Sequence, residues 1–246
     1  MTQPTTITGL GKGYTGQAIA ITGIGQVSTK QKIAAGQDPG KLTAKRLFGH
    51  PYKPFGRMDY FSKLGLAGIY KAMVDADRKD WQKKRNIGLV ASTRFGCLGT
   101  DHDYFATVKP DHGMAASPAL FAYTLPNCFL GEAAILLGLT GEGFVISDDD
   151  STGMAGLSMA MTSLLGDESI EAMVCGICDT PQPSQVKNQG NAFEGALFVV
   201  LEKTEQHPCK TYGTLGFDDS GAIIYNQETV GDIVELAENA LKGRKP

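Results

Sequence analysis

The pattern of apolar and polar residues along the chain predicts an α/β fold. Four short, mostly apolar runs are typical of strands that are covered on both faces of a sheet. These runs lie at residues 18–22, 87–92, 144–146 and 170–176. Segments with helical periodicity separate or follow them, so the order of elements favours a sheet with covering helices.

Two segments have the spacing of amphipathic helices. In the first, Leu66, Ile69, Tyr70 and Met73 recur on one helical face. In the second, Val230 to Lys242, apolar residues keep the same spacing while charged residues take the other face. Both segments are therefore predicted to cover the sheet.

Two other stretches lack a clear period. Residues 1–17 are polar and Gly-rich and are predicted to form a flexible arm. Their glycines precede the first strand, whereas a dinucleotide-binding loop follows a strand, so no cofactor is expected. Residues 29–56 are predicted to form a loop-rich excursion with one short helix.

The stretch from Ser151 to Leu165 carries no charged side chain. A helix here is apolar or small on every face, so it is predicted to be buried. It follows three consecutive aspartates, 148–150, whose oxygens can accept hydrogen bonds from the free N–H groups of the first helical turn. A strand, a sharp turn and a buried helix form the kind of elbow on which α/β enzymes carry a nucleophile.

The composition is that of an ordinary globular protein. The 246 residues are 42% hydrophobic and 20% charged, with a net charge of -3, which gives no indication of nucleic-acid binding. No apolar run approaches the roughly 20 residues that a membrane-spanning helix needs. The first residues also lack the charged and apolar regions of a signal peptide. We therefore expect one cytoplasmic domain over residues 1–246, without membrane contact.

The cysteines and histidines do not form a recognisable metal or redox site. Five cysteines at irregular spacing fit reduced thiols better than a disulfide framework, and the four histidines are scattered. Cys175 and Cys178 form a C-x-x-C pair without the second ligand pair of a zinc site, so both are expected in the core. Cys97 follows a strand in a glycine-bearing turn, where a helix N-terminus could activate a thiol as nucleophile.

Several stretches resemble β-ketoacyl synthases, in the thiolase-like condensing-enzyme family. AIAITGIGQVS is similar to the opening strand of that family, and RMDYFSKLGLAGIYKAMVDA is similar to the helix that follows it. LTGEGFVISDDDSTGMAGLSMA is similar to the segment that carries the family's nucleophile, and IEAMVCGICDTP to its strand ending in a Gly-Gly-x-Glu turn. AFEGALFVVLEK and its sequel are similar to a region with two strands, which we expect to pair through a short turn. Arg57 and Asp59 of the second motif are interpreted as solvated residues at a helix start.

The resemblance implies a thiolase-like fold, with a mixed sheet, a buried central helix and covering helices. The chain corresponds to a single half of the usual two-half architecture. When Gly153 is set on the family's glycine, Asp150 occupies the position of the catalytic cysteine. A carboxylate at a helix start is a stabilised anion and a weak nucleophile. The family's two catalytic histidines belong to its second half, so we predict no catalytic residue and no metal for this chain alone.

The resemblance also implies a partner. In ketoacyl synthase dimers the strand before the nucleophile pairs with its counterpart, and each acyl tunnel is closed by the other subunit. Phe144, Val145 and Ile146 correspond to this pairing strand. The residues that correspond to tunnel walls are Phe121, Leu125, Cys128 and Phe129, for which ordinary core packing is the alternative interpretation.

These features predict a non-catalytic subunit similar to a chain length factor. It would pair with an active β-ketoacyl synthase as a heterodimer and shape its acyl tunnel, in polyketide or polyene biosynthesis on an acyl carrier protein. Short subunits of this form occur in aryl polyene pathways, which are the first choice of pathway. The alternatives are an independent enzyme, with a metal site at Asp148–Asp150 or with Cys97 as nucleophile, and a purely structural homodimer.

Overall fold

The structure is a computed structural model that describes residues 12–14, 16–28, 42–80, 82–181, 193–206 and 211–243. Most of the predicted N-terminal arm lies outside these ranges. The part of it at Lys12–Tyr14 forms a 3-10 turn. Further 3-10 turns lie at Pro110–Gly113 and Thr204–Gln206.

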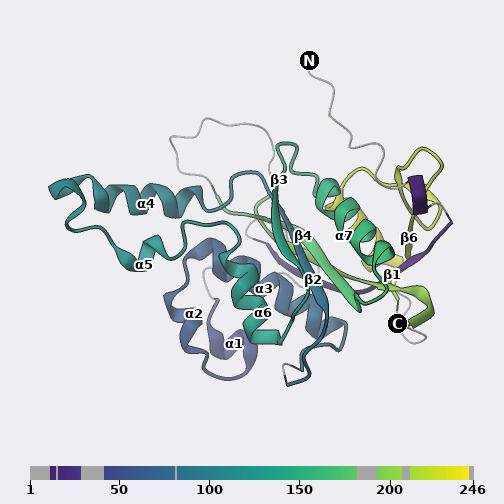
Figure 1. Ribbon diagram of the computed structural model, residues 1–246, viewed down its shortest axis with the longest axis horizontal. Coiled ribbons are helices and arrows are strands. Elements are labelled where there is room, and N and C mark those ends of the chain that lie inside the picture. Colours follow the sequence, from purple (N-terminus) through teal and green to yellow (C-terminus); the bar gives the residue numbers. More distant parts are fainter. Residues whose placement is uncertain are drawn as a thin grey trace, which may run out of the picture.

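A mixed sheet of eight strands runs through the molecule, with helices on both faces (Figure 1). The strands are β1 (Ile19–Ser28), β2 (Ile87–Thr93), β3 (Gly143–Ser147), β4 (Ala172–Asp179), β5 (Gly195–Lys203), β6 (Thr214–Phe217), β7 (Ile223–Tyr225) and β8 (Glu228–Thr229). Their order is β3-β2-β4-β5-β1-β6-β7-β8. β2 runs parallel to β3 and β4, and all other neighbouring pairs are antiparallel. The predicted α/β class and mixed, thiolase-like sheet are confirmed.

The helices bury two separate apolar clusters against the sheet. They are α1 (Ala44–Phe48), α2 (Lys53–Arg57), α3 (Tyr60–Asp75), α4 (Leu98–Val108), α5 (Pro118–Phe121), α6 (Cys128–Leu137), α7 (Met154–Gly166) and α8 (Ile233–Gly243). The cluster under α3 and α6 includes Phe129 and Phe198, and the one under α7 and α8 includes Leu157 and Phe217. The predicted central helix is α7, whose sheet-facing side is buried and whose outer side is partly exposed.

Two predictions about local structure are wrong. Within the 29–56 stretch, residues 29–41 lie outside the described ranges. The rest contains α1 and the beginning of α2, where one short helix was expected. Thr43 caps α1, and Pro54 lies in the first turn of α2. The strands β5 and β6 do not pair with each other. β1 lies between them, because its long apolar edge pairs with β5 over most of its length and with β6 at Ile19 and Ala20.

The contact between β1 and α3 depends on glycine. A Cβ atom at Gly25 would lie 2.2 Å from the backbone nitrogen of Ala72, and one at Gly23 would lie 2.4 Å from the Ala72 carbonyl oxygen. These glycines therefore allow the helix to approach the strand closely. At the register shift in β1, the Ile24 N–H donates to the Asp75 carboxylate at the end of α3, at 2.9 Å.

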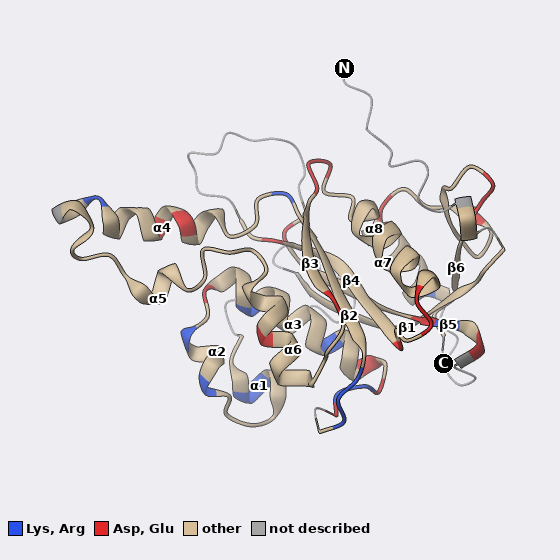
Figure 2. Cartoon of the chain, viewed as in Figure 1, with Lys and Arg blue, Asp and Glu red and all other residues tan. Residues whose placement is uncertain are grey.

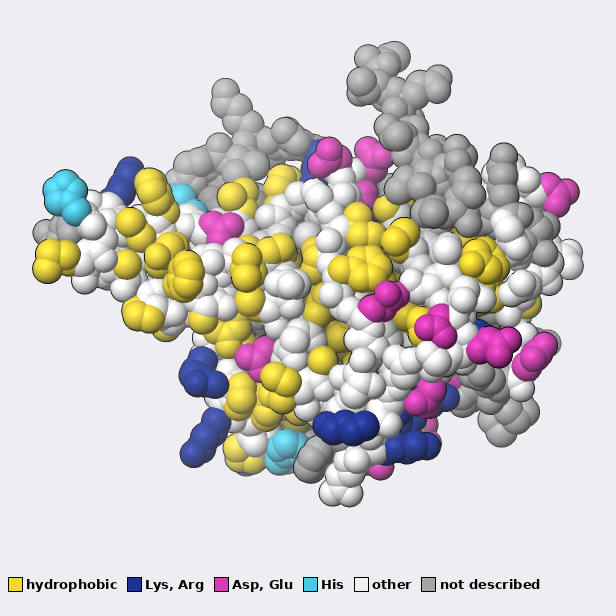
Figure 3. Space-filling view, in the orientation of Figure 1, with side chains coloured by type: hydrophobic (Ala, Val, Ile, Leu, Met, Phe, Trp, Pro, Cys, Tyr) yellow, Lys and Arg dark blue, Asp and Glu magenta, His cyan; other side chains and the backbone are white. Residues whose placement is uncertain are grey.

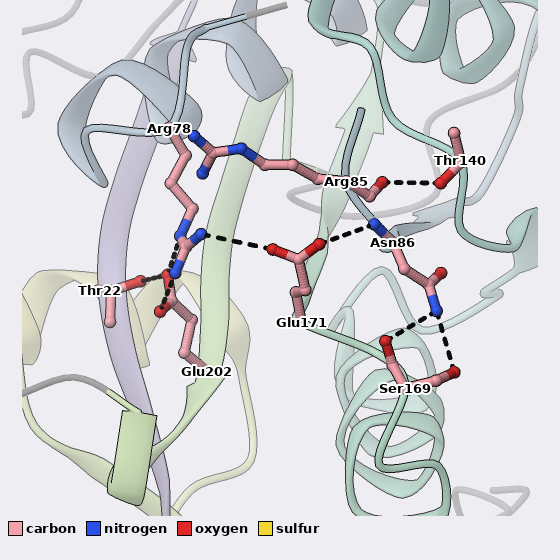
Figure 4. Close-up of polar contacts among 8 residues, drawn as sticks. All are labelled: Thr22, Arg78, Arg85, Asn86, Thr140, Ser169, Glu171 and Glu202. Atoms are coloured by element: carbon pink, nitrogen blue, oxygen red, sulfur yellow. Dashed lines mark hydrogen bonds and ion pairs between the residues drawn. The ribbon is translucent and has the colours of Figure 1, made fainter. Parts of the chain in front are cut away.

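A polar network joins several elements at the amino ends of β2 and β4 (Figure 4). Glu202, on β5, is fully buried and accepts two hydrogen bonds from Arg78, at 2.7 and 2.9 Å, and one from Thr22. Arg78 also lies 4.0 Å from Glu171, which accepts the Asn86 N–H. The buried charge of Glu202 is paired with the Arg78 guanidinium, so we interpret this pair as structural.

Candidate functional site

The turn between β3 and α7 has the form of a nucleophile elbow. Ser151 and Gly153 both have left-handed backbone angles, with φ of 55° and 71°. A Cβ atom at Gly153 would lie 2.5 Å from Ile177 and 2.6 Å from Ile233. Only glycine therefore fits between these side chains in this conformation. A non-glycine residue such as Ser151 is uncommon in the left-handed region, and such residues are concentrated at functional turns.

The three aspartates of this turn have different environments. Asp148 is buried, and its carboxylate accepts the Gly153 N–H at 2.7 Å. Asp149 and Asp150 are exposed. Figure 2 shows this acidic loop in red beyond the end of β3. Asp148 therefore fixes the residue before α7, while the N–H of Met154, the first residue of α7, donates to Thr152 Oγ1 at 3.4 Å. None of the three aspartates caps the first turn as expected, and Asp150 is exposed at the start of α7.

The geometry gives no support to a metal site at these aspartates. Within the described ranges, no group of three or more His, Cys, Asp or Glu side chains is placed to hold a metal ion. Asp148 already uses an oxygen for the Gly153 N–H and faces inward, away from its two exposed neighbours.

A second buried carboxylate lies at the same carboxyl ends of the parallel strands. Asp179, the last residue of β4, is 2% exposed. Its Oδ1 accepts hydrogen bonds from Thr93 Oγ1, at 2.7 Å, and from the N–H groups of Arg94 and Phe95, at 3.1 Å each. Burial raises the pKa of Asp179, and the charge of Asp148 acts in the same direction. The sequence analysis did not predict a role for this residue. Its position at the end of an apolar strand that is parallel to β3 could have indicated that it lies near the elbow.

The cysteines are unsuited to nucleophilic chemistry. Cys97 is buried, and its Sγ lies 3.7 Å from both carboxylate oxygens of Asp101. Burial, together with the Asp101 charge, raises the pKa of the Cys97 thiol to about 12. At neutral pH the thiol is therefore protonated. Cys175 and Cys178 are core residues as predicted, and they belong to the clusters on opposite faces of the sheet.

Asp59 lies at a helix start, as predicted, whereas Arg57 is the last residue of α2. Arg57 is exposed, whereas Asp59 is only partly solvated. The Asp59 carboxylate caps α3 by accepting the Ser62 N–H at 2.9 Å, and it also accepts the hydroxyl of Thr100 on α4. Asp59 therefore holds α4 to the start of α3.

The four predicted tunnel residues separate into exposed and buried groups. Phe121 is 60% exposed and Leu125 is 62% exposed. Cys128 is half-buried, and its S–H points to the Ala122 carbonyl at 3.2 Å. Phe129 is fully buried, with its ring centroid 5.3 Å from that of Phe61. Core packing therefore accounts for Phe129, while Phe121 and Leu125 remain available to another molecule.

Among the described strands, β3 forms one edge of the sheet and pairs with β2 alone. Phe144, Val145 and Ile146 of this strand are partly exposed, between α6 and α7. The opposite edge strand, β8, has only two residues, both exposed. A longer apolar edge of this kind normally requires a cover or a partner strand.

Apolar side chains continue from this edge onto a projection formed by α4 and α5 (Figure 1). Figure 3 shows hydrophobic side chains spread along the projection and across the middle of the same face. The exposed members include Phe105, Met114, Phe121, Leu125 and Ile135. In α4 only Thr100 is buried, so the described residues leave most of this helix uncovered.

Comparisons with known proteins agree with the architecture. Residues 18–207 match the family described as "Beta-ketoacyl synthase, N-terminal domain". No curated protein sequence matches the chain. None of the described helices is long and apolar enough to cross a membrane.

Solved structures with a similar fold come from polyketide assembly systems. One is a type II polyketide acyl carrier protein bound to its ketosynthase, AntDE:AntF (TM-score 0.63, 20% identity, covering 81% of this chain and 67% of that one). A second is the ketosynthase ApeO with its chain length factor ApeC from Xenorhabdus doucetiae (TM-score 0.57, 15% identity, 76% and 79%). A third is the ishigamide ketosynthase/chain length factor (TM-score 0.57, 14% identity, 81% and 62%). At these identities the likeness concerns the fold.

Proposed function

Because the chain belongs to the family of β-ketoacyl synthase N-terminal domains, we propose that it is a non-catalytic subunit of the chain-length-factor type. It pairs with an active β-ketoacyl synthase and shapes the acyl tunnel of that partner. The observation that carries the proposal is the exposed carboxylate of Asp150 on a fully formed elbow at the start of α7. The fold keeps the support for a nucleophile while the nucleophile itself is absent.

The chemistry supports a subunit that does not condense acyl chains. Condensation needs a thiolate that holds the growing chain as a thioester, together with hydrogen-bond donors for the developing negative charge. Asp150 has no sulfur and cannot form a thioester, and an acyl anhydride formed on its carboxylate would hydrolyse readily. Cys97, the cysteine considered as a substitute nucleophile, has its pKa raised to about 12 by burial and by Asp101.

The open apolar edge supports pairing with another chain. The edge of β3, the exposed Phe121 and Leu125, and the uncovered α4–α5 projection lie on connected elements. In the proposed complex this surface faces the ketosynthase, and the acyl carrier protein delivers substrate to the complex. Aryl polyene synthesis is the pathway we propose, and the ApeO–ApeC complex has a fold of the same type.

Coexpression with the ketosynthase encoded nearest to this chain tests the proposal. We expect a heterodimer whose product length changes when Leu125 is replaced by Trp, since a larger side chain at an exposed position can narrow a shared tunnel without disturbing the core. Replacing Leu241, which is exposed on α8 and outside this surface, by Trp is the matched control. A chain that never enters a complex, or products that are unchanged by Leu125→Trp in an intact complex, would contradict the proposal.

A further inference from the structure

The backbone hydrogen bonds of β3 define which groups its open edge offers. The Leu89 N–H donates to the Glu142 carbonyl, and the Asp148 N–H donates to the Thr93 carbonyl. Residues 142 and 148 therefore face β2. Because successive residues of a strand direct their N–H and C=O groups to opposite sides, Gly143, Val145 and Ser147 direct theirs to the open edge.

This alternation fixes the way in which a second copy could pair. Antiparallel pairing across a two-fold axis must set outward-facing residues opposite one another. In the register that pairs all three outward-facing residues, Val145 lies opposite Val145 of the copy and Gly143 lies opposite Ser147. In that register Glu142 lies opposite Asp148 of the copy, next to the exposed Asp149 and Asp150.

The two-fold symmetry repeats this arrangement at both ends of the strand pair. Glu142, Asp149 and Asp150 are exposed. Like charges at facing positions of paired strands are destabilising. The acidic loop shown in Figure 2 would therefore meet Glu142 of the copy twice in one interface.

The cations of this region do not remove the conflict. Lys83, Lys84 and Arg85 precede β2 and Arg94 follows it, so they lie one strand further from the open edge. The guanidinium of Arg94 lies over the ring of Phe95, 5.2 Å from its centroid. A strand that pairs with the open edge of β3 therefore lies closer to Glu142, Asp149 and Asp150 than to these cations.

We infer that β3 is selective against its own copy, and that its partner is a different chain with basic residues at the flanks of its edge strand. This inference rests on the proposed function, since it names the chemistry of the ketosynthase strand that pairs with β3. The apolar residues of β3 supply attraction to any edge strand, and the acidic flanks supply the repulsion that specificity requires.

The oligomeric state of the purified full-length chain tests the inference. Sedimentation velocity should show weaker self-association for the wild type than for Glu142→Lys, in which the reversed charge faces the acidic loop of the copy at both ends. We expect a change of about tenfold or more in the dissociation constant. Glu228→Lys makes the same charge change on the opposite edge, in the exposed strand β8, and should have no effect.

Proline substitution shows whether β3 is the contact. The Val145 N–H points to the open edge, so Val145→Pro removes an edge donor without removing a bond to β2. It should abolish the self-association gained by Glu142→Lys. Ser147→Pro removes a second outward donor and replaces Val145→Pro if the first variant does not fold, as judged by circular dichroism.

Addition of the ketosynthase separates the two proposals. Glu142→Lys should weaken the heterodimer about tenfold, while Glu228→Lys should not. A wild-type homodimer that Val145→Pro dissociates and Glu142→Lys leaves unchanged would overturn the inference and leave the proposed function standing. A ketosynthase complex that neither proline variant weakens would overturn pairing through β3, and with it the proposed function.

Discussion

Two buried carboxylates close to the elbow, Asp148 and Asp179, accept hydrogen bonds from protein groups. Asp148 accepts the Gly153 N–H, and Asp179 accepts three donors from the β2–α4 segment. Both are buried at the carboxyl edge of parallel strands. A buried charge is costly even when it is hydrogen-bonded, so these residues fix the turn geometry at some expense of stability.

Asp179→Asn should therefore raise the free energy of unfolding at pH 7, by on the order of 1 kcal/mol. The amide oxygen can accept the three donors that Oδ1 now accepts, while the cost of the buried charge disappears. Because the folded-state pKa of Asp179 is raised by burial, the carboxyl contributes most stability when protonated and loses it as the pH rises through that pKa. The gain should therefore shrink as the pH falls towards 4. Urea unfolding at both pH values, with the exposed Asp150→Asn as control, measures it, and a gain that persists at pH 4 would contradict this account.

At the scale of elements, the strand, elbow and helix form one unit that the local sequence nearly specifies. The uncharged run predicts α7, the aspartates predict its start, and Gly153 marks the left-handed turn. The length and position of this unit agree with the structure because each depends on neighbouring residues. The helix α4 was not predicted, because it has little apolar periodicity and buries only Thr100.

Gly153→Ala should disrupt this unit. Alanine would have to adopt the left-handed backbone conformation of Gly153. Its Cβ atom would lie 2.5 Å from Ile177 and 2.6 Å from Ile233. We expect a loss of about 2–4 kcal/mol. Gly131→Ala is the matched control, because Gly131 lies within α6 with open space around it, and it should stabilise the protein by about 0.5–1 kcal/mol. Thermal unfolding compares the two, and equal midpoints would refute the steric argument.

At the scale of the whole molecule, the sheet is asymmetric. One edge, β8, is short and exposed, and the other, β3, is apolar and open. The interior is closed at the amino ends of β2 and β4 by the network around Arg78 and Glu202, and the elbow lies at the opposite ends of these strands. Stability and recognition are therefore concentrated at different ends of the same sheet.

Arg78→Met should destabilise the protein by about 3–5 kcal/mol, because it leaves the fully buried Glu202 without its cation. The double variant Arg78→Met, Glu202→Leu should recover much of this loss, since no buried charge remains. Lys79→Met, at the exposed neighbouring position, should change the free energy of unfolding by less than about 0.5 kcal/mol. Chemical denaturation of the four proteins decides the point, and a double variant no more stable than Arg78→Met would count against a pairing role.

The sequence by itself determined the longer strands, the helices α3, α7 and α8, the elbow with Asp150 and the family resemblance, because these follow from periodicity, turn residues and local order. Only the tertiary structure decided that β1 separates β5 from β6, that Asp179 shares an edge with Asp148, and that Phe129 is buried while Leu125 is exposed. Those facts depend on contacts between residues far apart in the chain, which no local pattern records. The open edge of β3 is also a feature that only the tertiary structure decided. The sequence shows that this strand is apolar, but only the strand order of the sheet shows that one side of it is unpaired.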